Sequence, residues 1–100
     1  MITSADNKQI KALSALIKKS KERRKQRLFV TEGPKMSFEA PPEWVNQIYV
    51  SESFYKDENN AKKLEQYEDK LWVVKDSVFN AVSDTQTPQG VMALVKMPEY

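Results

Sequence analysis

The 100-residue sequence contains no cysteine and no histidine, and it has only two glycines. Without these side chains the chain has no disulfide framework, no Cys/His zinc site, no cysteine nucleophile and no Ser-His-Asp triad. Two glycines are also too few for a phosphate-binding or dinucleotide-binding loop. Most familiar catalytic constellations are therefore excluded for this chain.

Long apolar runs are lacking as well. The longest extends from Val91 to Val95, far short of the roughly 20 residues that span a bilayer, and the polar amino terminus is unlike a signal peptide. We therefore expect a cytoplasmic protein without membrane contact. A content of 40% hydrophobic and 30% charged residues is typical of a globular chain, and 100 residues suffice for one hydrophobic core.

The net charge of +2 conceals a strong asymmetry along the chain. Residues 1–27 hold nine basic and two acidic residues, a balance of +7, whereas the other 73 hold seven basic and twelve acidic residues, a balance of −5. Lysine and arginine gain affinity for a polyanion by displacing counterions from its phosphates. Nucleic acid is therefore the leading class of partner. The alternative is a solvated helix face followed by an exposed basic loop.

The apolar pattern predicts alternating helices and strands. A first helix begins after the N-cap Asn7 and runs to about Lys19, with one apolar and one cationic side, and Ser20–Gln26 follows as an exposed connection or a frayed helix end. Strands are predicted at 28–31, 47–50, 71–74 and 90–95, with a short helix from Pro34, a helix from Ser51 or Ser53 to about Tyr67, and a short helix capped by Asp76. This order predicts a three-layer α/β/α sandwich with a four-stranded mixed sheet.

Three segments are candidates for ligand contact. The basic segment Lys18–Arg27 has three arginines and no interleaved aromatic residue, a pattern that predicts phosphate contact rather than base stacking. The turn from Glu32 to Lys35 could hold an anion at a helix start, or Glu32 could serve as a purely structural cap. The polar stretch Thr85–Gly90 could donate to phosphate, ribose or base edges, or satisfy its own backbone.

Two other groups of residues are interpreted as structural. The acidic residues Glu65, Glu68 and Asp69 are typical of a solvated helix face rather than a metal site. Four of the aromatic residues lie in or beside predicted core elements, so we interpret them as core packing rather than as a stacking platform; they are Trp44, Tyr49, Trp72 and Phe79.

Several motifs together resemble a known family. In chain order they are Met1–Ser4 leading to Asn7, then Ile10-Lys11, the basic connection, Phe29–Gly33, and Ser83–Gly90 followed by Val91-Met92-Ala93. They resemble the amino-terminal substrate-binding domain of SpoU-family (SPOUT class) RNA ribose 2′-O-methyltransferases, which implies a fold similar to the ribosomal proteins that bind kink-turn RNA. Lys8 departs from the proline that many relatives have there, and the prolines between Pro34 and Trp44 interrupt a region where relatives continue a longer helix.

The resemblance implies that residues 1–100 form an RNA substrate-binding domain. Methyl transfer would belong to a carboxy-terminal knotted domain that binds S-adenosylmethionine, whose linker would begin near Tyr100. No catalytic, cofactor-binding or metal-binding residue is then expected in this chain. The expected RNA-contact residues are Asn7, Lys11, Lys18, Lys19, Lys21, Arg23, Arg24, Lys25, Arg27, Glu32, Gly33, Lys35, Thr85, Thr87, Gln89 and Gly90.

The expected partner is a structured ribosomal or transfer RNA, with a monomeric isolated domain and a parent that forms homodimers through the knotted domain. Two alternatives stay open. One is a stand-alone RNA-binding scaffold of the kink-turn type, and the other is a protein-interaction domain whose basic stretch meets an acidic partner. RNA binding above that of simple polycations would exclude the second, and a reading frame that continues past Tyr100 would disfavour the first.

Overall fold

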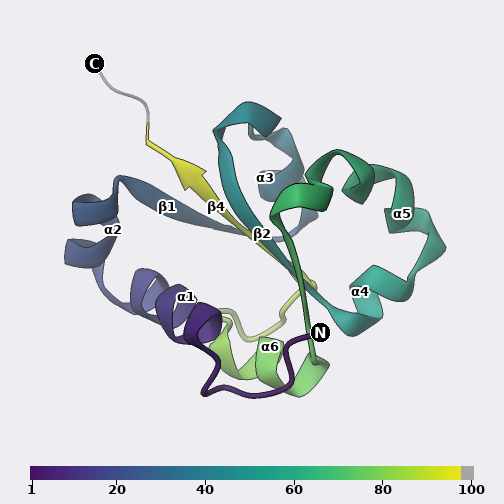
Figure 1. Cartoon of the computed structure of the whole chain (residues 1–100), viewed down its shortest axis with the longest axis horizontal. Helices are drawn as coiled ribbons and strands as arrows, with labels where there is room; N and C mark the ends of the chain where they lie inside the picture. The colour runs from purple at the N-terminus through teal and green to yellow at the C-terminus, as the bar shows by residue number, and fades with distance from the viewer. Residues whose placement is uncertain (98–100) are drawn as a thin grey trace.

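In the computed structural model, which describes residues 1–97, one sheet lies between two layers of helices (Figure 1). The elements are α1 (Lys8–Lys18), α2 (Ser20–Gln26), β1 (Leu28–Glu32), α3 (Pro34–Glu39), the 3-10 turn η1 (Pro42–Trp44), β2 (Val45–Ser51), α4 (Glu52–Lys56), α5 (Glu58–Leu64), the 3-10 helix η2 (Glu65–Lys70), β3 (Leu71–Val74), α6 (Asp76–Val82) and β4 (Val91–Lys96). The predicted α/β/α sandwich is confirmed. The predicted linker start at Tyr100 lies outside the described residues.

The four strands form a mixed sheet in the order β1-β4-β2-β3. Strand β4 is antiparallel to both of its neighbours, whereas β2 and β3 are parallel. Strands β1, β2 and β3 therefore end at one edge of the sheet, where β4 begins, and we call it the carboxyl edge. The opposite edge, where β1 and β2 begin and β4 ends, is the amino edge.

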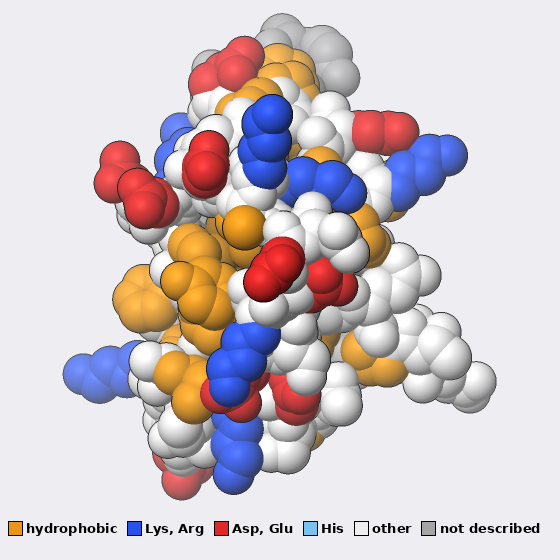
Figure 2. Space-filling view, turned by 90° about the vertical axis from the view of Figure 1, so that its right-hand side faces the viewer, with side chains coloured by type: hydrophobic (Ala, Val, Ile, Leu, Met, Phe, Trp, Pro, Cys, Tyr) orange, Lys and Arg blue, Asp and Glu red, His pale blue; other side chains and the backbone are white. Residues whose placement is uncertain are grey.

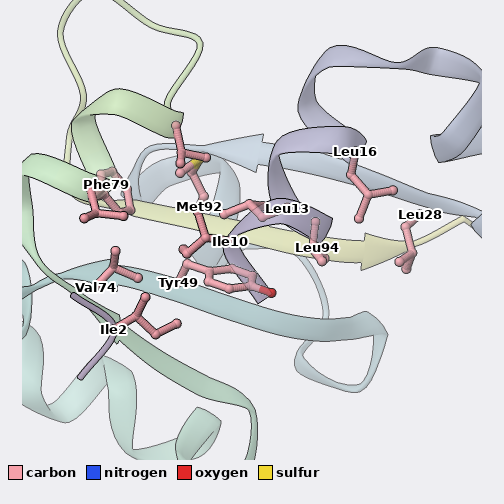
Figure 3. Close-up of a cluster of buried hydrophobic side chains, with 12 residues drawn as sticks. Ile2, Ile10, Leu13, Leu16, Leu28, Tyr49, Val74, Phe79, Met92 and Leu94 are labelled. Atoms are coloured by element: carbon pink, nitrogen blue, oxygen red, sulfur yellow. The ribbon is translucent and has the colours of Figure 1, made fainter. Parts of the chain in front are cut away.

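Two hydrophobic cores hold the layers together, one on each face of the sheet. Helices α1 and α6 cover the first, in which Leu13, Tyr49, Phe79 and Met92 are buried (Figure 3). The second core combines residues from β2 and β4 with Leu64 and Tyr67. Successive residues of a strand point to opposite faces, so β4 supplies side chains to both cores, and residues 91–95 are an unbroken apolar run.

Local sequence signals explain why α1 forms where it does. The Asn7 side-chain oxygen accepts a hydrogen bond of 2.8 Å from the Gln9 backbone N–H, so the predicted N-cap is confirmed. The apolar side is confirmed as well, because Ile10, Leu13 and Leu16 are buried. No helix within residues 1–97 is long and apolar enough to cross a membrane.

The segment Ser20–Gln26 is neither the exposed connection nor the frayed helix end that the sequence predicts. The segment is the regular helix α2, and none of its side chains is buried. It ends at Arg27, which has a left-handed backbone with φ 57°. A helix with no buried face has no apolar periodicity, so its helix-forming Lys, Glu, Arg and Gln residues were the remaining sequence signal.

Two further predictions about the region 51–82 are wrong. The single helix up to Tyr67 is divided into α4, α5 and η2, because Asp57 starts a new helix by accepting from the Asn59 N–H at 3.0 Å. Asp76 does not cap α6, whose N-cap position is Lys75. Its carboxylate instead accepts from the backbone N–H of Ser53 at 3.0 Å and from the Ser53 hydroxyl.

The aromatic predictions are confirmed in part. Tyr49 and Phe79 are buried, with 1% and 2% exposure, and Trp72 is half-buried against the first core. The prediction that Trp44 packs in the core is wrong, because 42% of its surface is exposed. It sits in a single 3-10 turn after two prolines, and this turn holds no buried residue.

Candidate nucleic-acid interface

The polar segment 83–90 forms a loop at the carboxyl edge, and its start is bonded to the end of β1. The Glu32 carboxylate accepts from the Ser83 hydroxyl at 3.2 Å and from the Asp84 backbone N–H at 3.1 Å. Glu32 is half-buried. It therefore positions this loop. The predicted cap is wrong, because the N-cap of α3 is Gly33 and no side chain caps this helix.

The other end of the loop is fixed by two glycines that have positive φ angles. Gly33 has φ 90° and Gly90 has φ 85°, a conformation that L side chains rarely adopt. A Cβ on Gly33 would lie 3.0 Å from the Gln89 Oε1, and one on Gly90 would lie 2.9 Å from the Ser51 Oγ. The Ser51 N–H also donates to the Gly90 carbonyl at 2.9 Å. Gln89 thus lies against Gly33, and the loop is held at both ends.

The middle of this loop faces solvent. Thr85, Gln86 and Thr87 are all exposed. The Thr85 hydroxyl accepts from the Thr87 N–H at 3.4 Å, so it serves its own turn in part. Within residues 1–97, the side chains of Gln86 and Thr87 make no hydrogen bond, and the loop exposes them together with the carboxylate of Asp84.

Helix α1 contributes a cationic groove that lies beside this loop. The groove lies between α1 and α6.

 The volume of this groove is about 260 Å³. The charged residues in its lining are Lys11 and Lys18, and Ala81 and Val82 of α6 form the opposite wall. Because Val82 directly precedes the loop 83–90, the groove lies beside the start of this loop.

Arg23 has a structural role in α2. Its Nη1 donates to the backbone carbonyls of Leu16 at 2.7 Å and Ile17 at 2.9 Å, and the side chain is half-buried. The last carbonyls of a helix have no partner within the helix, so Arg23 satisfies the end of α1 and fixes α2 beside it. It also lines a hollow of about 400 Å³ along β1, together with Glu32 and Asp84.

The remaining predicted contact residues fall into two groups. Lys19, Lys21, Arg24 and Lys25 are exposed at the junction of α1 with α2 and along α2, and Arg27 is exposed at the amino edge. Lys35 is exposed in the first turn of α3, near the carboxyl edge. The fold thus brings Glu32, Gly33 and the loop 83–90 together, whereas Arg27 lies at the far end of β1. Asn7 is used as a helix cap.

Sequence reasoning missed a polar hollow beside the loop. It has a volume of about 380 Å³ and includes Ser53, Asn60, Asp76 and Asn80 as well as Gln89. The hydrogen bonds from Ser53 hold the pKa of Asp76 below its usual value. These residues come from α4, α5, α6 and the loop 83–90, so a signal in any one segment could not identify them.

The face of the molecule formed by α4 and α5 carries charges of both signs. Figure 2 shows the face of α4 and α5, on which Lys and Arg side chains alternate with Asp and Glu. Glu65, Glu68 and Asp69 are exposed on η2. Within residues 1–97, no group of three acidic side chains could hold a metal ion. The basic residues of the amino-terminal segment lie on α1 and α2, and α1 covers the opposite face of the sheet (Figure 1).

Comparison with known proteins gives one family and several relatives. The family described as the MRM3-like substrate binding domain matches residues 7–93. The 23S rRNA (guanosine(2553)-2′-O)-methyltransferase RlmP of Bacillus subtilis (strain 168) is 34% identical over 100 residues, which are 98% of this chain and 38% of that protein.

Two solved structures share the fold. An rRNA methyltransferase from Sinorhizobium meliloti has a TM-score of 0.75 at 23% identity, over 99% of this chain and 37% of its own. An AdoMet-bound rRNA methyltransferase from the same organism has a TM-score of 0.73 at 20% identity, over the same shares. The chain thus spans less than two fifths of the length of these relatives.

Proposed function

We propose that this chain, which belongs to the MRM3-like substrate binding domain family, binds RNA for a methyl-transferring domain outside residues 1–100. One observation carries the proposal. The polar loop 83–90 is fixed at the carboxyl edge by Glu32 and the two glycines, and the groove lined by Lys11 and Lys18 lies beside its start. A fixed polar loop next to a basic groove suits a ligand that has both phosphates and readable polar edges.

The class of RNA that we propose is ribosomal RNA. The relative from Bacillus subtilis is named for 23S rRNA and for 2′-O-methylation, and it is 34% identical to this chain. We extend this substrate class to the present protein, in preference to transfer RNA. A ribosomal RNA substrate would also place the protein in the cytoplasm.

The two kinds of contact residue have different tasks in this proposal. The exposed basic residues of α1 and α2 contact phosphates, which gives affinity with little sequence preference. Gln86 and Thr87 at the tip of the loop donate to ribose hydroxyls or base edges, which gives preference for one RNA over another. Glu32 and Gln89 act by positioning the loop.

S-adenosylmethionine does not fit this chain as a resident cofactor. Both glycines are covered by the protein's own side chains, with Gln89 against Gly33 and Ser51 against Gly90. Neither leaves an open stretch of backbone for the close approach of a cofactor. We therefore assign cofactor binding to the domain outside this chain, and calorimetric titration of the chain with S-adenosylmethionine should give no saturable heat. We also propose that homodimer formation belongs to that domain.

The test of the proposal is a binding titration by fluorescence anisotropy. The probes are a 23S rRNA fragment that contains the nucleotide for which the relative is named, a scrambled RNA of equal length and transfer RNA. We expect salt-dependent binding of all three, with the 23S fragment bound most tightly. Binding no stronger than that of a polylysine of matched charge would overturn RNA recognition and favour the protein-interaction alternative.

A further inference from the structure

The polar hollow of about 380 Å³ beside the loop 83–90 lies at the carboxyl edge, where α4 and α6 begin (Figure 1). Its lining contains two carboxylates, those of Asp57 and Asp76, and three side-chain amides, those of Asn60, Asn80 and Gln89. Within residues 1–97, no lysine or arginine lines this hollow. A lining rich in acceptors and without a cation suits a ligand that donates hydrogen bonds and is not an anion.

The Asp76 carboxylate has acceptor capacity left for such a ligand. Its Oδ1 accepts from the Ser53 backbone N–H at 3.0 Å, and its Oδ2 accepts from the Ser53 hydroxyl. A carboxylate oxygen has two lone pairs, so each oxygen keeps one acceptor site beside these bonds. The bonds from Ser53 also hold the pKa of Asp76 below its usual value, so the group is ionised at neutral pH. Ser53 thus fixes a charged acceptor with two oxygens in the wall of the hollow.

Asn80 adds a donor one helical turn from this carboxylate. Residues 76 and 80 are four apart in α6, so their side chains lie on the same face of the helix, with about 5–6 Å between their Cβ atoms. Both of them line the hollow. The Asn80 side chain is exposed and makes no hydrogen bond within residues 1–97. Its Nδ2 is therefore available to a ligand that also contacts the Asp76 oxygens.

Helices α4 and α5 contribute a further acceptor and an aromatic ring. The Asn60 Nδ2 donates to the Phe54 carbonyl at 3.0 Å, which leaves the Asn60 Oδ1 as an acceptor. Phe54 is half-buried and also lines the hollow. A Cβ on Gly90 would lie 3.2 Å from the Phe54 Cδ2, so the end of the loop 83–90 packs closely against this ring. The hollow therefore combines an apolar surface with a few polar groups, as pockets for small organic ligands do.

We propose that this hollow receives one unpaired base of the RNA and that it selects guanine. The inference rests on the RNA-binding function proposed above. Guanine presents two neighbouring donors, N1–H and the N2 amino group, to the Asp76 oxygens, and its O6 accepts from the Asn80 amide. Adenine and cytosine have one exocyclic amino group each, and uracil would set a carbonyl oxygen against the carboxylate. This base is distinct from the methylated nucleotide, because the proposed function assigns methyl transfer to a domain outside residues 1–100.

The position of the hollow favours a base of the RNA over a basic side chain of a protein partner. Gln89 and Gly90 of the loop 83–90 also line the hollow, so a nucleotide next to those that the loop contacts can enter it. A lysine or arginine side chain has no acceptor, and it would leave the Asn80 Nδ2 unpaired. The carboxylates keep phosphates outside the hollow. Lys75 is exposed at the start of α6 and outside the lining, where it can contact the phosphate of the same nucleotide.

The first experiment compares short single-stranded RNAs that differ in one base. Each is an oligouridine with a central guanosine, adenosine, cytidine or uridine, and fluorescence anisotropy measures its binding to the chain. We expect the guanosine RNA to bind about tenfold more tightly than the uridine RNA, within the roughly 5- to 100-fold range of one bidentate contact to a base. Asn80→Ala should reduce this preference about threefold, the loss of one neutral hydrogen bond. The matched control is Asn59→Ala, which makes the same truncation at an exposed position of α5 outside the lining and should keep the full preference.

The second experiment uses ligands without phosphate, so that contacts of the basic segment do not contribute. Guanosine should shift the side-chain amide signals of Asn60 and Asn80 in the NMR spectrum of the isotope-labelled chain, and uridine should not. N-acetylarginine amide is the probe for a basic protein side chain. Asn80→Asp should weaken the binding of guanosine, because it sets an acceptor against O6, and it should strengthen the binding of the arginine probe.

The outcomes separate the inference from the proposed function. If the wild-type chain binds no RNA, the proposed function itself fails. If it binds RNA but holds the guanosine and uridine RNAs equally, or if Asn80→Ala behaves like Asn59→Ala, the base pocket is wrong and RNA binding stands. Amide shifts with the arginine probe and none with guanosine would identify a basic side chain as the occupant and overturn the inference. Thermal unfolding checks that the variants are folded, and the nucleoside titration of the wild type needs no variant.

Discussion

Replacement of Glu32 by glutamine tests how the loop 83–90 is positioned. The carboxylate accepts from the Ser83 hydroxyl at 3.2 Å and from the Asp84 N–H at 3.1 Å. Glutamine has nearly the same shape, but its amide is neutral and offers one acceptor oxygen in place of two. Hydrogen bonds to charged groups contribute about 1.5–3 kcal/mol and neutral ones about 0.5–1.5 kcal/mol.

The expected loss of stability is at the low end of the difference between charged and neutral hydrogen bonds. Asp84 is exposed and Glu32 is half-buried, so water can replace part of what the carboxylate provides. We expect Glu32→Gln to lower the free energy of unfolding by about 1 kcal/mol and Glu32→Ala by about 2 kcal/mol. Urea denaturation measures both values. The matched control is Glu68→Gln, because Glu68 is exposed on η2 and makes no side-chain hydrogen bond within residues 1–97.

The direction in which Glu32→Gln changes RNA affinity distinguishes two roles of Glu32, positioning of the loop and repulsion of phosphate. If Glu32 positions the loop, the variant should lose preference for cognate over scrambled RNA, and the Asp84 amide should exchange with solvent faster. If Glu32 merely repels phosphate, removal of its charge should strengthen binding of every RNA and leave the exchange rate unchanged. The second result, measured by anisotropy and hydrogen exchange, would refute the positioning role.

Three further predictions concern single side chains. Arg23→Ala should lower the free energy of unfolding by about 1–3 kcal/mol, because it leaves carbonyls of α1 without a partner. Arg24→Ala should change the free energy of unfolding by less than about 0.5 kcal/mol and reduce the salt dependence of RNA binding. Urea denaturation measures the change in stability, and anisotropy measures the change in RNA binding. Tyr67→Phe should raise stability by about 1 kcal/mol in urea denaturation, because the buried Tyr67 hydroxyl has no hydrogen-bond partner within residues 1–97. Burial raises the pKa of Tyr49 to about 12, so between pH 10 and 12 the unfolded chain releases a proton that the folded chain keeps, and stability should fall by about 1.4 kcal/mol per pH unit. Tyr49→Phe should lack this part of the alkaline loss in denaturation curves recorded across that range.

Much of the fold could be predicted because its signals are local. The Asn7 cap and the spacing of Ile10, Leu13 and Leu16 define α1 within a short window. The apolar run of β4 shows that this strand is buried on both faces. Helix α2 and the division at Asp57 could not be predicted in the same way, because α2 buries no side chain and Asp57 is one of several polar residues in its segment.

The candidate site could be predicted as a set of residues, but its arrangement could not. The contact between Glu32 and Ser83 joins residues that are 51 positions apart, and it exists because β1 and β4 are neighbours in the sheet. The strand order depends on the packing of the whole chain and leaves no trace in any single segment. The same pairing carries Lys96 from the acidic part of the sequence to the basic end of β1. A count of charge along the chain therefore cannot tell which basic residues share one surface, because the order of the strands decides it.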